Sequence, residues 1–346
     1  MRIAFVLPAP SRVPSGGPLV VMQHAQGLAE RGHTVRVVAP KRIAGETGWV
    51  RSVALGVANR IQGVAEASVL ERPGVRLEEP PRLRDIELDD DAVIATGIQT
   101  LGSIKDSEKG WWFVQGDETF VRPDARTAWQ LPVRTIPCSE WLATEIRAAG
   151  GTVAGVVPNA VDPDRFGIDT PIRARDPHVL ALYHRHPVKG PETLLSVLRD
   201  LRRERPDVRL TVFSARTPSH RMPGGVDVVV RPDADQLRAL YNASSVFLHT
   251  SRSEGWALTP MEAAACGAAV VATDSRGPSE YLTADRSMLC VPVDDADGLL
   301  CGALALLDDT DRRVELATAA FQDVNRFDWA SSTDRLEQIL LSRGGG

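Results

Sequence analysis

The residues best able to do chemistry are gathered in residues 251–267, in the second half of the sequence. This segment contains two glutamates, Glu254 and Glu262, with seven residues between them. Carboxylates can accept hydrogen bonds from sugar hydroxyl groups. An apolar, strand-like run ends near Thr250 and a helical pattern begins at Pro260, so backbone N–H groups and a helix N-terminus face the strand end, where they can bind a diphosphate. The segment predicts a site for a ligand with both hydroxyl and phosphate groups.

Each glutamate also has a plainer interpretation. Thr259 and Glu262 are spaced as in a capping box, with Pro260 as the first helical residue. Glu254 by itself fits a solvated loop carboxylate. Only the segment as a whole favours ligand binding.

A second candidate follows a strand-like run early in the second half, in the sequence Tyr183-His-Arg-His-Pro-Val-Lys-Gly190. Only four of the 40 basic residues are lysines, and Lys189 is the one lysine of the second half. Together with Arg185 it places two cations at a strand end, where they can neutralise phosphates that gain charge as a bound group leaves. An ordinary surface loop is the alternative.

The first half gives weaker signals. Gly16 and Gly17 follow the first strand-like run. Adjacent glycines let the backbone approach a phosphate closely, although any tight turn uses them too. Polar residues Gln115, Asp117 and Glu118 end a later strand-like run, which fits contact with a second substrate as well as it fits a solvated loop.

Composition limits the class of protein. The chain has 346 residues, 43% hydrophobic and 25% charged, as expected for a globular protein of two domains. The net charge of −5 shows no basic excess that would indicate a nucleic-acid partner. No apolar run reaches the roughly 18 residues that span a bilayer. Residues 1–8 fit a buried strand better than a signal peptide, so we expect a cytoplasmic location and no integral membrane segment.

The sequence does not predict a disulfide, a metal site or a cofactor. Its four cysteines are widely spaced and are expected to be buried as small apolar side chains: Cys138, Cys266, Cys290 and Cys301. The acidic run at residues 89–91 precedes a strand-like run, whereas sugar-transfer metal sites follow one. We therefore expect a charged turn there.

Strand-like runs alternate with helical patterns along the whole chain, which predicts parallel sheets with helices on both faces. The expected strands are residues 3–7, 34–39, 92–96, 112–115, 133–137, 153–157, 179–183, 209–213, 226–230, 246–249, 269–272 and 288–291. The expected helices are residues 19–31, 141–149, 192–203, 235–242, 260–266, 296–307 and 312–324. Residues 42–90 are left unassigned because their periodicity is weak.

A stretch rich in Pro and Asp, residues 158–177, divides this pattern. We expect an N-terminal domain at 1–160 and a C-terminal domain at 170–326, both doubly wound Rossmann-like α/β domains that face a central cleft. Such sheets bind ligands at the carboxyl ends of their strands. A last amphipathic helix, about 328–343, follows a complete second domain and is a candidate to cross back to the first.

The segment with the two glutamates, together with the strand-like run after it, resembles the signature of glycosyltransferase family 4, whose fold is called GT-B. The family pattern Ser-x-x-Glu-Gly-Phe-Gly-Leu, Glu-Ala-x-Ala-x-Gly, Pro-Val-Val-Ala appears here as Ser251-x-x-Glu-Gly-Trp-Ala-Leu258, Glu262-Ala-Ala-Ala-Cys-Gly267 and Ala269-Val-Val-Ala272. Residues 183–190 resemble the family's Gly-Arg…Lys-Gly element, residues 158–162 its Pro-Asn-Gly-Val-Asp, and residues 276–280 its Gly-Gly-x-x-Glu loop. Residues 113–118 are similar to a stretch of some polysaccharide rhamnosyltransferases, which implies relatives that transfer deoxysugars to polysaccharides or natural products.

The resemblance implies roles for individual residues. Arg185, Lys189 and Glu254 would be catalytic, with Glu254 on the donor sugar. Glu262 would bind the ribose, and Glu280 would orient the phosphate site. The remaining substrate-binding residues implied are Gly16, Gly17, Gln115, Asp117, Gly255, Trp256, Ala257, Leu258 and Thr259. The chain departs from the family at Trp256 and Ala257, where Phe and Gly are usual, at His184, and at residues 111–120, which lack the family's histidine.

The resemblance also implies a function. The expected enzyme is a retaining, metal-independent glycosyltransferase that uses no cofactor. It would move a sugar from a nucleotide-diphosphate donor to a hydroxyl of a glycan, lipid-linked or natural-product acceptor. The alternatives are a sugar-nucleotide epimerase of similar fold and a non-catalytic subunit that binds sugar nucleotides.

Overall fold

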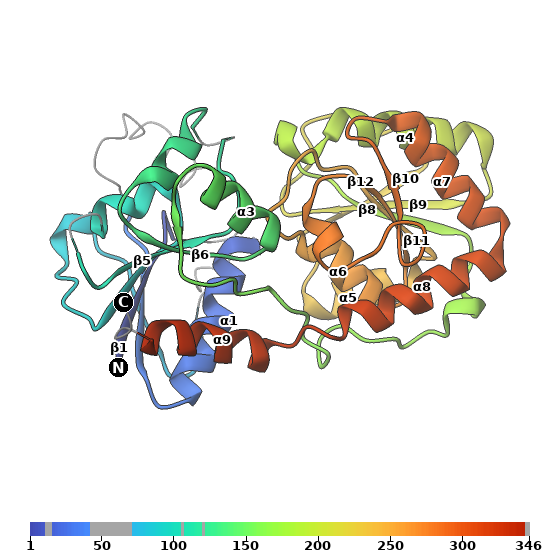
Figure 1. The fold of residues 1–346 in the computed structure, drawn as a ribbon. Coiled ribbons are helices and arrows are strands. Elements are labelled where there is room, and N and C mark those ends of the chain that lie inside the picture. Colours follow the sequence, from blue (N-terminus) through green and yellow to red (C-terminus); the bar gives the residue numbers. More distant parts are fainter. Residues whose placement is uncertain (11–15, 42–70, 105–106, 120–121, 343–346) are drawn as a thin grey trace. The chain divides into compact units, whose positions relative to one another are not determined.

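The computed structural model describes residues 1–10, 16–41, 71–104, 107–119 and 122–342 (Figure 1). The chain divides into two units. Unit 1 contains residues 1–159 and 329–346, and unit 2 contains residues 160–328.

Unit 1 is built on a parallel sheet in the order β3-β2-β1-β4-β5-β6-β7. Its strands are β1 (Arg2–Val6), β2 (Thr34–Val38), β3 (Val75–Glu78), β4 (Ala92–Ala95), β5 (Gly110–Val114), β6 (Arg134–Pro137) and β7 (Thr152–Val153). β4 and β5 are buried along their whole length, as continuous apolar runs in parallel sheets usually are. Its helices are α1 (Gly16–Glu30), α3 (Glu140–Ala148) and α9 (Trp329–Leu341), with short 3₁₀ helices at η1 (Leu83–Asp85), η2 (Ile98–Ser103) and η3 (Ala125–Gln130).

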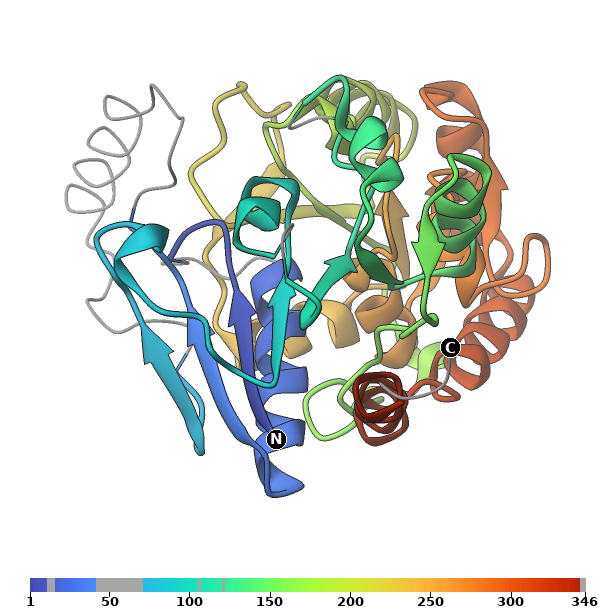
Figure 2. The same cartoon turned by 60° about the vertical axis from the view of Figure 1, so that its left-hand side comes forward.

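The last helix of the chain, α9, packs on α1, the first helix, as Figures 1 and 2 show. His24 of α1 is fully buried, and its Nδ1 lies 3.2 Å from Thr333 Oγ1 of α9. At the surface, Arg31 pairs with Asp334 at 2.6 Å. The polypeptide therefore returns to unit 1 after it has completed unit 2.

Unit 2 is built on a second parallel sheet in the order β10-β9-β8-β11-β12-β13. Its strands are β8 (His178–Leu182), β9 (Arg209–Ser214), β10 (Val226–Val230), β11 (Val246–His249), β12 (Ala269–Thr273) and β13 (Leu289–Val291). Its helices are α4 (Pro191–Glu204), α5 (Ala234–Ala243), α6 (Leu258–Ala265), α7 (Ala296–Asp308) and α8 (Thr310–Val324), with 3₁₀ helices at η4 (Ile172–Ala174), η5 (Pro187–Lys189) and η6 (Gly277–Glu280). The apolar core joins the central strands to α4, α7 and α8.

Both sheets reverse the direction of strand addition at one place, between β1 and β4 in unit 1 and between β8 and β11 in unit 2. Doubly wound sheets bind ligands outside the carboxyl ends of the strands at such a point. The expected fold class, two doubly wound Rossmann-like parallel sheets, is confirmed. Of the unassigned residues 42–90, the structure adds β3 and η1, and residues 42–70 lie outside the described part.

Two expectations about individual residues need correction. Helix α6 begins at Leu258, two residues before Pro260. Cys138 and Cys266 are buried, but Cys290 is half-buried and Cys301 is exposed, so the expectation of burial is wrong for the last two. The acidic run at 89–91 lies directly before β4 and is a charged turn as expected, with Arg2 paired to Asp89.

Candidate functional site

Three loops of unit 2 meet where the strand order reverses: residues 183–190 after β8, 250–257 after β11 and 274–281 after β12. The backbone N–H of Arg252 donates to the Val188 carbonyl at 2.7 Å, and Thr250 Oγ1 donates to the Lys189 carbonyl at 2.9 Å. The Glu254 N–H donates to the Ser275 carbonyl at 2.9 Å. These bonds join the middle loop to both of its neighbours.

Two glycines permit these contacts. Gly190 has a φ of +61°, and a Cβ atom at that position would overlap the Thr250 carbonyl. A Cβ at Gly277 would come within 2.7 Å of the Trp256 backbone and 2.8 Å of Glu254 Cβ. A larger residue at either position would push the loops apart.

Lys189 and Glu254 form an ion pair at the junction of the loops, with 2.6 Å between Nζ and Oε1. The Glu254 side chain is 12% exposed and that of Lys189 29%. Burial, the largest single influence, raises the pKa of Glu254, but the charge and hydrogen bond of Lys189 together with His249 and Ser251 outweigh burial, and the pKa falls below its usual range. Glu254 is therefore a carboxylate near neutral pH.

His249, the last residue of β11, is a site residue that was not predicted from the sequence. Its Nε2 lies 3.9 Å from Glu254 Oε1 and 3.2 Å from Ser275 Oγ. Burial lowers the pKa of His249 to about 4, so the ring is neutral near pH 7. A polar residue that ends an otherwise apolar strand was the signal that pointed to it.

Glu262 lies on α6 and is held by a residue of α5. Tyr241 Oη donates to Glu262 Oε2 at 2.9 Å. Burial raises the pKa of Glu262 to about 7, although this hydrogen bond opposes the rise. Because α6 begins at Leu258, Glu262 is its fifth residue and lies beyond the third position that a capping box requires. The capping-box interpretation with Thr259 is therefore wrong.

The turn into α6 is held by buried aromatic side chains. Trp256 is buried, and its ring packs 5.3 Å, centroid to centroid, from the rings of Tyr281 and Phe327. Tyr281 Oη donates to the Ala257 carbonyl at 2.6 Å. The Trp256 indole thus belongs to the core. The backbone of Trp256 can still contact a ligand, which is the role expected for the backbone of Gly255–Thr259 as a group. Helix α6 begins at Leu258, four residues after Glu254.

The remaining predicted residues of unit 2 lie in the same loops. Arg185 is exposed and forms no hydrogen bond or ion pair with the residues that the structure describes. The N–H of His186 donates to His184 Nδ1 at 3.1 Å, which shapes the loop around Arg185. Glu280 is the half-buried last residue of η6.

Two of the predicted sites of unit 1, the glycine pair and Gln115, lie close together. Gly16 and Gly17 open α1, and a Cβ at Gly17 would lie 3.4 Å from the amide oxygen of Gln115. Asp117 does not extend freely into solvent, because it pairs with Arg126 at 3.1 Å. Residues 11–15, which precede α1, lie outside the described part.

Glu118, which the sequence analysis named beside Gln115 and Asp117, is buried in the structure. It is 9% exposed, and its Oε2 accepts a hydrogen bond from the Ile98 N–H at 2.8 Å. Burial raises the pKa of Glu118 to about 7.

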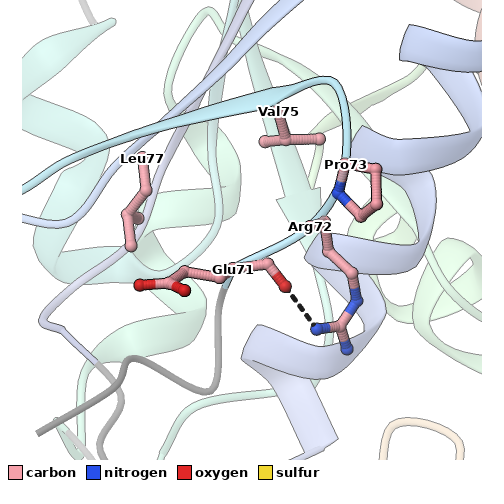
Figure 3. Close-up of a pocket in the computed structure, with 5 residues that line it drawn as sticks. All are labelled: Glu71, Arg72, Pro73, Val75 and Leu77. Atoms are coloured by element: carbon pink, nitrogen blue, oxygen red, sulfur yellow. Dashed lines mark hydrogen bonds between the residues drawn. The ribbon is translucent and has the colours of Figure 1, made fainter.

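A hollow of about 420 Å³ lies at the start of β3, away from the carboxyl ends of the strands where the candidate residues lie (Figure 3). It is lined by Glu71, Arg72, Pro73, Val75 and Leu77. Gly74 there approaches Ala29 near the C-terminus of α1, which places the hollow at the amino ends of the strands. It contains none of the predicted site residues.

The described part of the chain lacks two features that would change the class of site. No group of three or more His, Cys, Asp or Glu side chains is placed to hold a metal ion there. No helix among the described residues has the length and apolar character needed to cross a membrane.

Comparison with known proteins identifies unit 2. The family described as glycosyl transferases group 1 matches residues 168–323. A D-inositol 3-phosphate glycosyltransferase of Corynebacterium kroppenstedtii is 29% identical over 44% of this chain and 37% of its own. A phosphatidyl-myo-inositol mannosyltransferase of Mycobacterium tuberculosis is 26% identical over 100% of this chain and 98% of its own.

Solved structures support the fold of the whole chain. HepE from Anabaena, in complex with UDP-glucose, has a TM-score of 0.73 at 16% identity and covers 99% of this chain and 100% of its own. The chain spans about half the length of several curated relatives: the matched part covers between 37% and 61% of each relative's own length. Residues 168–323, nearly all of unit 2, thus match the group 1 glycosyl transferases, and the likeness to HepE shows that the whole chain shares its fold.

Proposed function

We propose that the chain transfers a sugar from a nucleotide-diphosphate donor to an acceptor hydroxyl, with retention at the anomeric carbon. The observation that carries this proposal is the Lys189–Glu254 pair beside the N-terminus of α6, at the point where the strand order of unit 2 reverses. A cation, a carboxylate and the N-terminus of a helix together match a diphosphate joined to a sugar.

The donor would be bound by residues of unit 2. Lys189, Arg185 and the N–H groups at the start of α6 bind the diphosphate and stabilise the charge that it gains as the sugar leaves. Glu254 accepts hydrogen bonds from the sugar hydroxyls, and Glu262 accepts them from the ribose through the carboxylate oxygen that Tyr241 leaves free. The backbone of Gly255–Thr259 lies along the diphosphate, and Glu280 steadies this region from η6.

The acceptor would be bound by residues of unit 1. Gly16, Gly17, Gln115 and Asp117 lie at the carboxyl edge of its sheet. The leaving diphosphate takes the proton of the acceptor hydroxyl, so the reaction needs no separate base. Transfer without a metal ion or cofactor is part of the proposal, and turnover in excess EDTA that equals turnover with Mg²⁺ would support it. A cytoplasmic location stays a prediction.

A thermal-shift screen across nucleoside diphosphates and nucleotide sugars tests the donor assignment. A ligand at 100 times its dissociation constant adds about 2.7 kcal/mol of stability, so a true donor raises the melting temperature clearly. UDP-glucose is the first candidate because the similar HepE structure contains it. The Lys189→Ala variant is the control, and it should lose most of the shift given by the diphosphate.

The alternatives make different products. The group 1 match and the relatives named as glycosyltransferases favour transfer over epimerisation or binding alone. Incubation of the donor without acceptor should give at most slow hydrolysis. An epimerised nucleotide sugar, or an unchanged donor under all acceptor conditions, would contradict the proposal.

A further inference from the structure

Lys189 is paired with Glu254 in the structure, and the proposed function gives it a second partner, the diphosphate of the donor. Its ammonium group is 2.6 Å from Glu254 Oε1. The diphosphate in the proposed function needs the same ammonium group. A cation that is already paired binds a new anion only by sharing or giving up its first partner.

The backbones on both sides of this ion pair are fixed. Glu254 is held by its N–H bond to Ser275 and by the close approach of Gly277 to its Cβ. Lys189 is held by the bond from Thr250 to its carbonyl and by Gly190 against the same residue. Glu254 therefore cannot follow the lysine, and any adjustment falls on the flexible side chain of Lys189.

The loss of Lys189 would leave the carboxylate poorly solvated. Glu254 is only 12% exposed, and the hydrogen bond that it accepts from Ser251 comes from a neutral hydroxyl, which does not replace the charge of Lys189. A buried carboxylate without a partner is strongly unfavourable. Sugar hydroxyls are hydrogen-bond donors that can take the place of the ammonium group on Glu254.

We propose that the Lys189–Glu254 ion pair makes the site discriminate between an intact nucleotide sugar and the bare nucleoside diphosphate that remains after transfer. This inference rests on the proposed function. The nucleotide sugar compensates Glu254 with its hydroxyls while its diphosphate takes Lys189. The bare diphosphate takes Lys189 and leaves Glu254 unpaired, so it binds less tightly and the product is released.

A double-mutant cycle measures the competition directly. The probes are UDP with UDP-glucose and GDP with GDP-mannose, titrated by calorimetry into the whole chain. Glu254→Gln keeps the shape of the side chain and removes its charge. We expect it to bind the bare diphosphate roughly five- to tenfold more tightly than the wild type does, within the usual range of coupling between sites. The same variant should bind the nucleotide sugar no more tightly than the wild type.

Two second-site variants show whether Lys189 carries the effect. In a Lys189→Ala background, Glu254→Gln should no longer tighten diphosphate binding. Arg185→Ala is the matched control, because Arg185 is a cation of the same loop that is not paired with Glu254. Arg185→Ala should weaken the binding of the diphosphate and of the nucleotide sugar by the same factor. Glu254→Gln should tighten diphosphate binding by the same factor with or without Arg185→Ala. Glu254→Asp, which draws the carboxylate back from Lys189, gives a second test with an intermediate gain if Glu254→Gln does not fold.

The outcomes separate this inference from the function on which it rests. If Glu254→Gln weakens the binding of the bare diphosphate or leaves it unchanged, Glu254 does not compete for Lys189, and the inference alone is overturned. A wild-type chain that binds neither diphosphate nor nucleotide sugar would contradict the proposed function, and the inference with it.

Discussion

Ala257 has a backbone conformation that favours glycine, with φ +71° and ψ +91° directly before α6. For an L-residue a positive φ costs about 1–2 kcal/mol of stability, and glycine avoids this cost. Glycine also loses more chain entropy on folding, which lowers stability by about 0.5–1 kcal/mol. We expect Ala257→Gly to leave the free energy of unfolding unchanged or to raise it by up to about 1 kcal/mol. Denaturant unfolding measures this, and Ala264→Gly at a buried position in the last turn of α6 is the control that should lose stability. A similar loss in both variants would mean that Ala257 is not strained.

Glu262 links stability to pH. Its pKa is about 7 in the folded chain against an ordinary value of 4.5. A raised pKa favours the protonated, folded form, so the stabilising contribution is complete below pH 4.5 and is lost as the pH rises through about 7. Glu262→Gln cannot ionise, and it should gain stability relative to the wild type between pH 5 and pH 8, by up to about 3 kcal/mol. A stability difference that does not change over this range would show that Glu262 ionises normally.

At this scale the sequence predicted the residue types of the site better than their contacts. Lys189 and Glu254 were both predicted, on separate motifs 65 residues apart, but no pattern in either motif shows that they pair. Their contact depends on β8 and β11 lying side by side, which is a property of strand order. His249 was missed for a related reason, since only the fold places it beside Glu254.

Among the elements, the helices and strands were largely predictable because their hydrophobic periodicity is strong. The start of α6 was misplaced because proline is common at the first helical position, whereas Pro260 is the third residue of this helix. The true start is set by the positive φ of Ala257, and alanine gives no sequence signal for that conformation. Strand β3 was not predicted because its residues are only partly buried, so its apolar pattern is weak.

The close contact between η6 and the loop after β11 gives a prediction for Gly277. A Cβ there would lie 2.7 Å from the Trp256 backbone, which cannot move without disturbing the turn into α6. We expect Gly277→Ala to destabilise the chain by about 1–3 kcal/mol, as overpacking usually does, and to weaken nucleotide binding. Gly224→Ala is the control, because a Cβ at Gly224 meets nothing within 4 Å. Thermal unfolding and a titration with UDP measure both effects, and equal behaviour of the two variants would count against the loop junction.

For the whole molecule, the sequence predicted the fold class because two complete βα patterns follow one another along the chain. The packing of α9 was harder to predict, since an amphipathic helix shows only that one of its faces is buried. In the structure, Leu336 and Leu340 are buried, and Asp334 and Glu337 of α9 pair with Arg31 and His33, which directly follow α1. Complementary charges such as Arg31 and Asp334 are too common in this sequence to identify a partner helix in advance.

The packing of α9 on α1 predicts that a cavity in the last helix weakens the first unit. Leu336 is fully buried in unit 1 and Leu316 of α8 is fully buried in unit 2, so Leu336→Ala and Leu316→Ala form a matched pair. Each should lose about 2–5 kcal/mol of stability in its own unit. Hydrogen exchange followed by peptide separates the two: Leu336→Ala should speed exchange in β1 and α1, and Leu316→Ala in β8 and β12. If Leu336→Ala instead speeds exchange in unit 2 and leaves β1 and α1 protected, α9 does not stabilise unit 1.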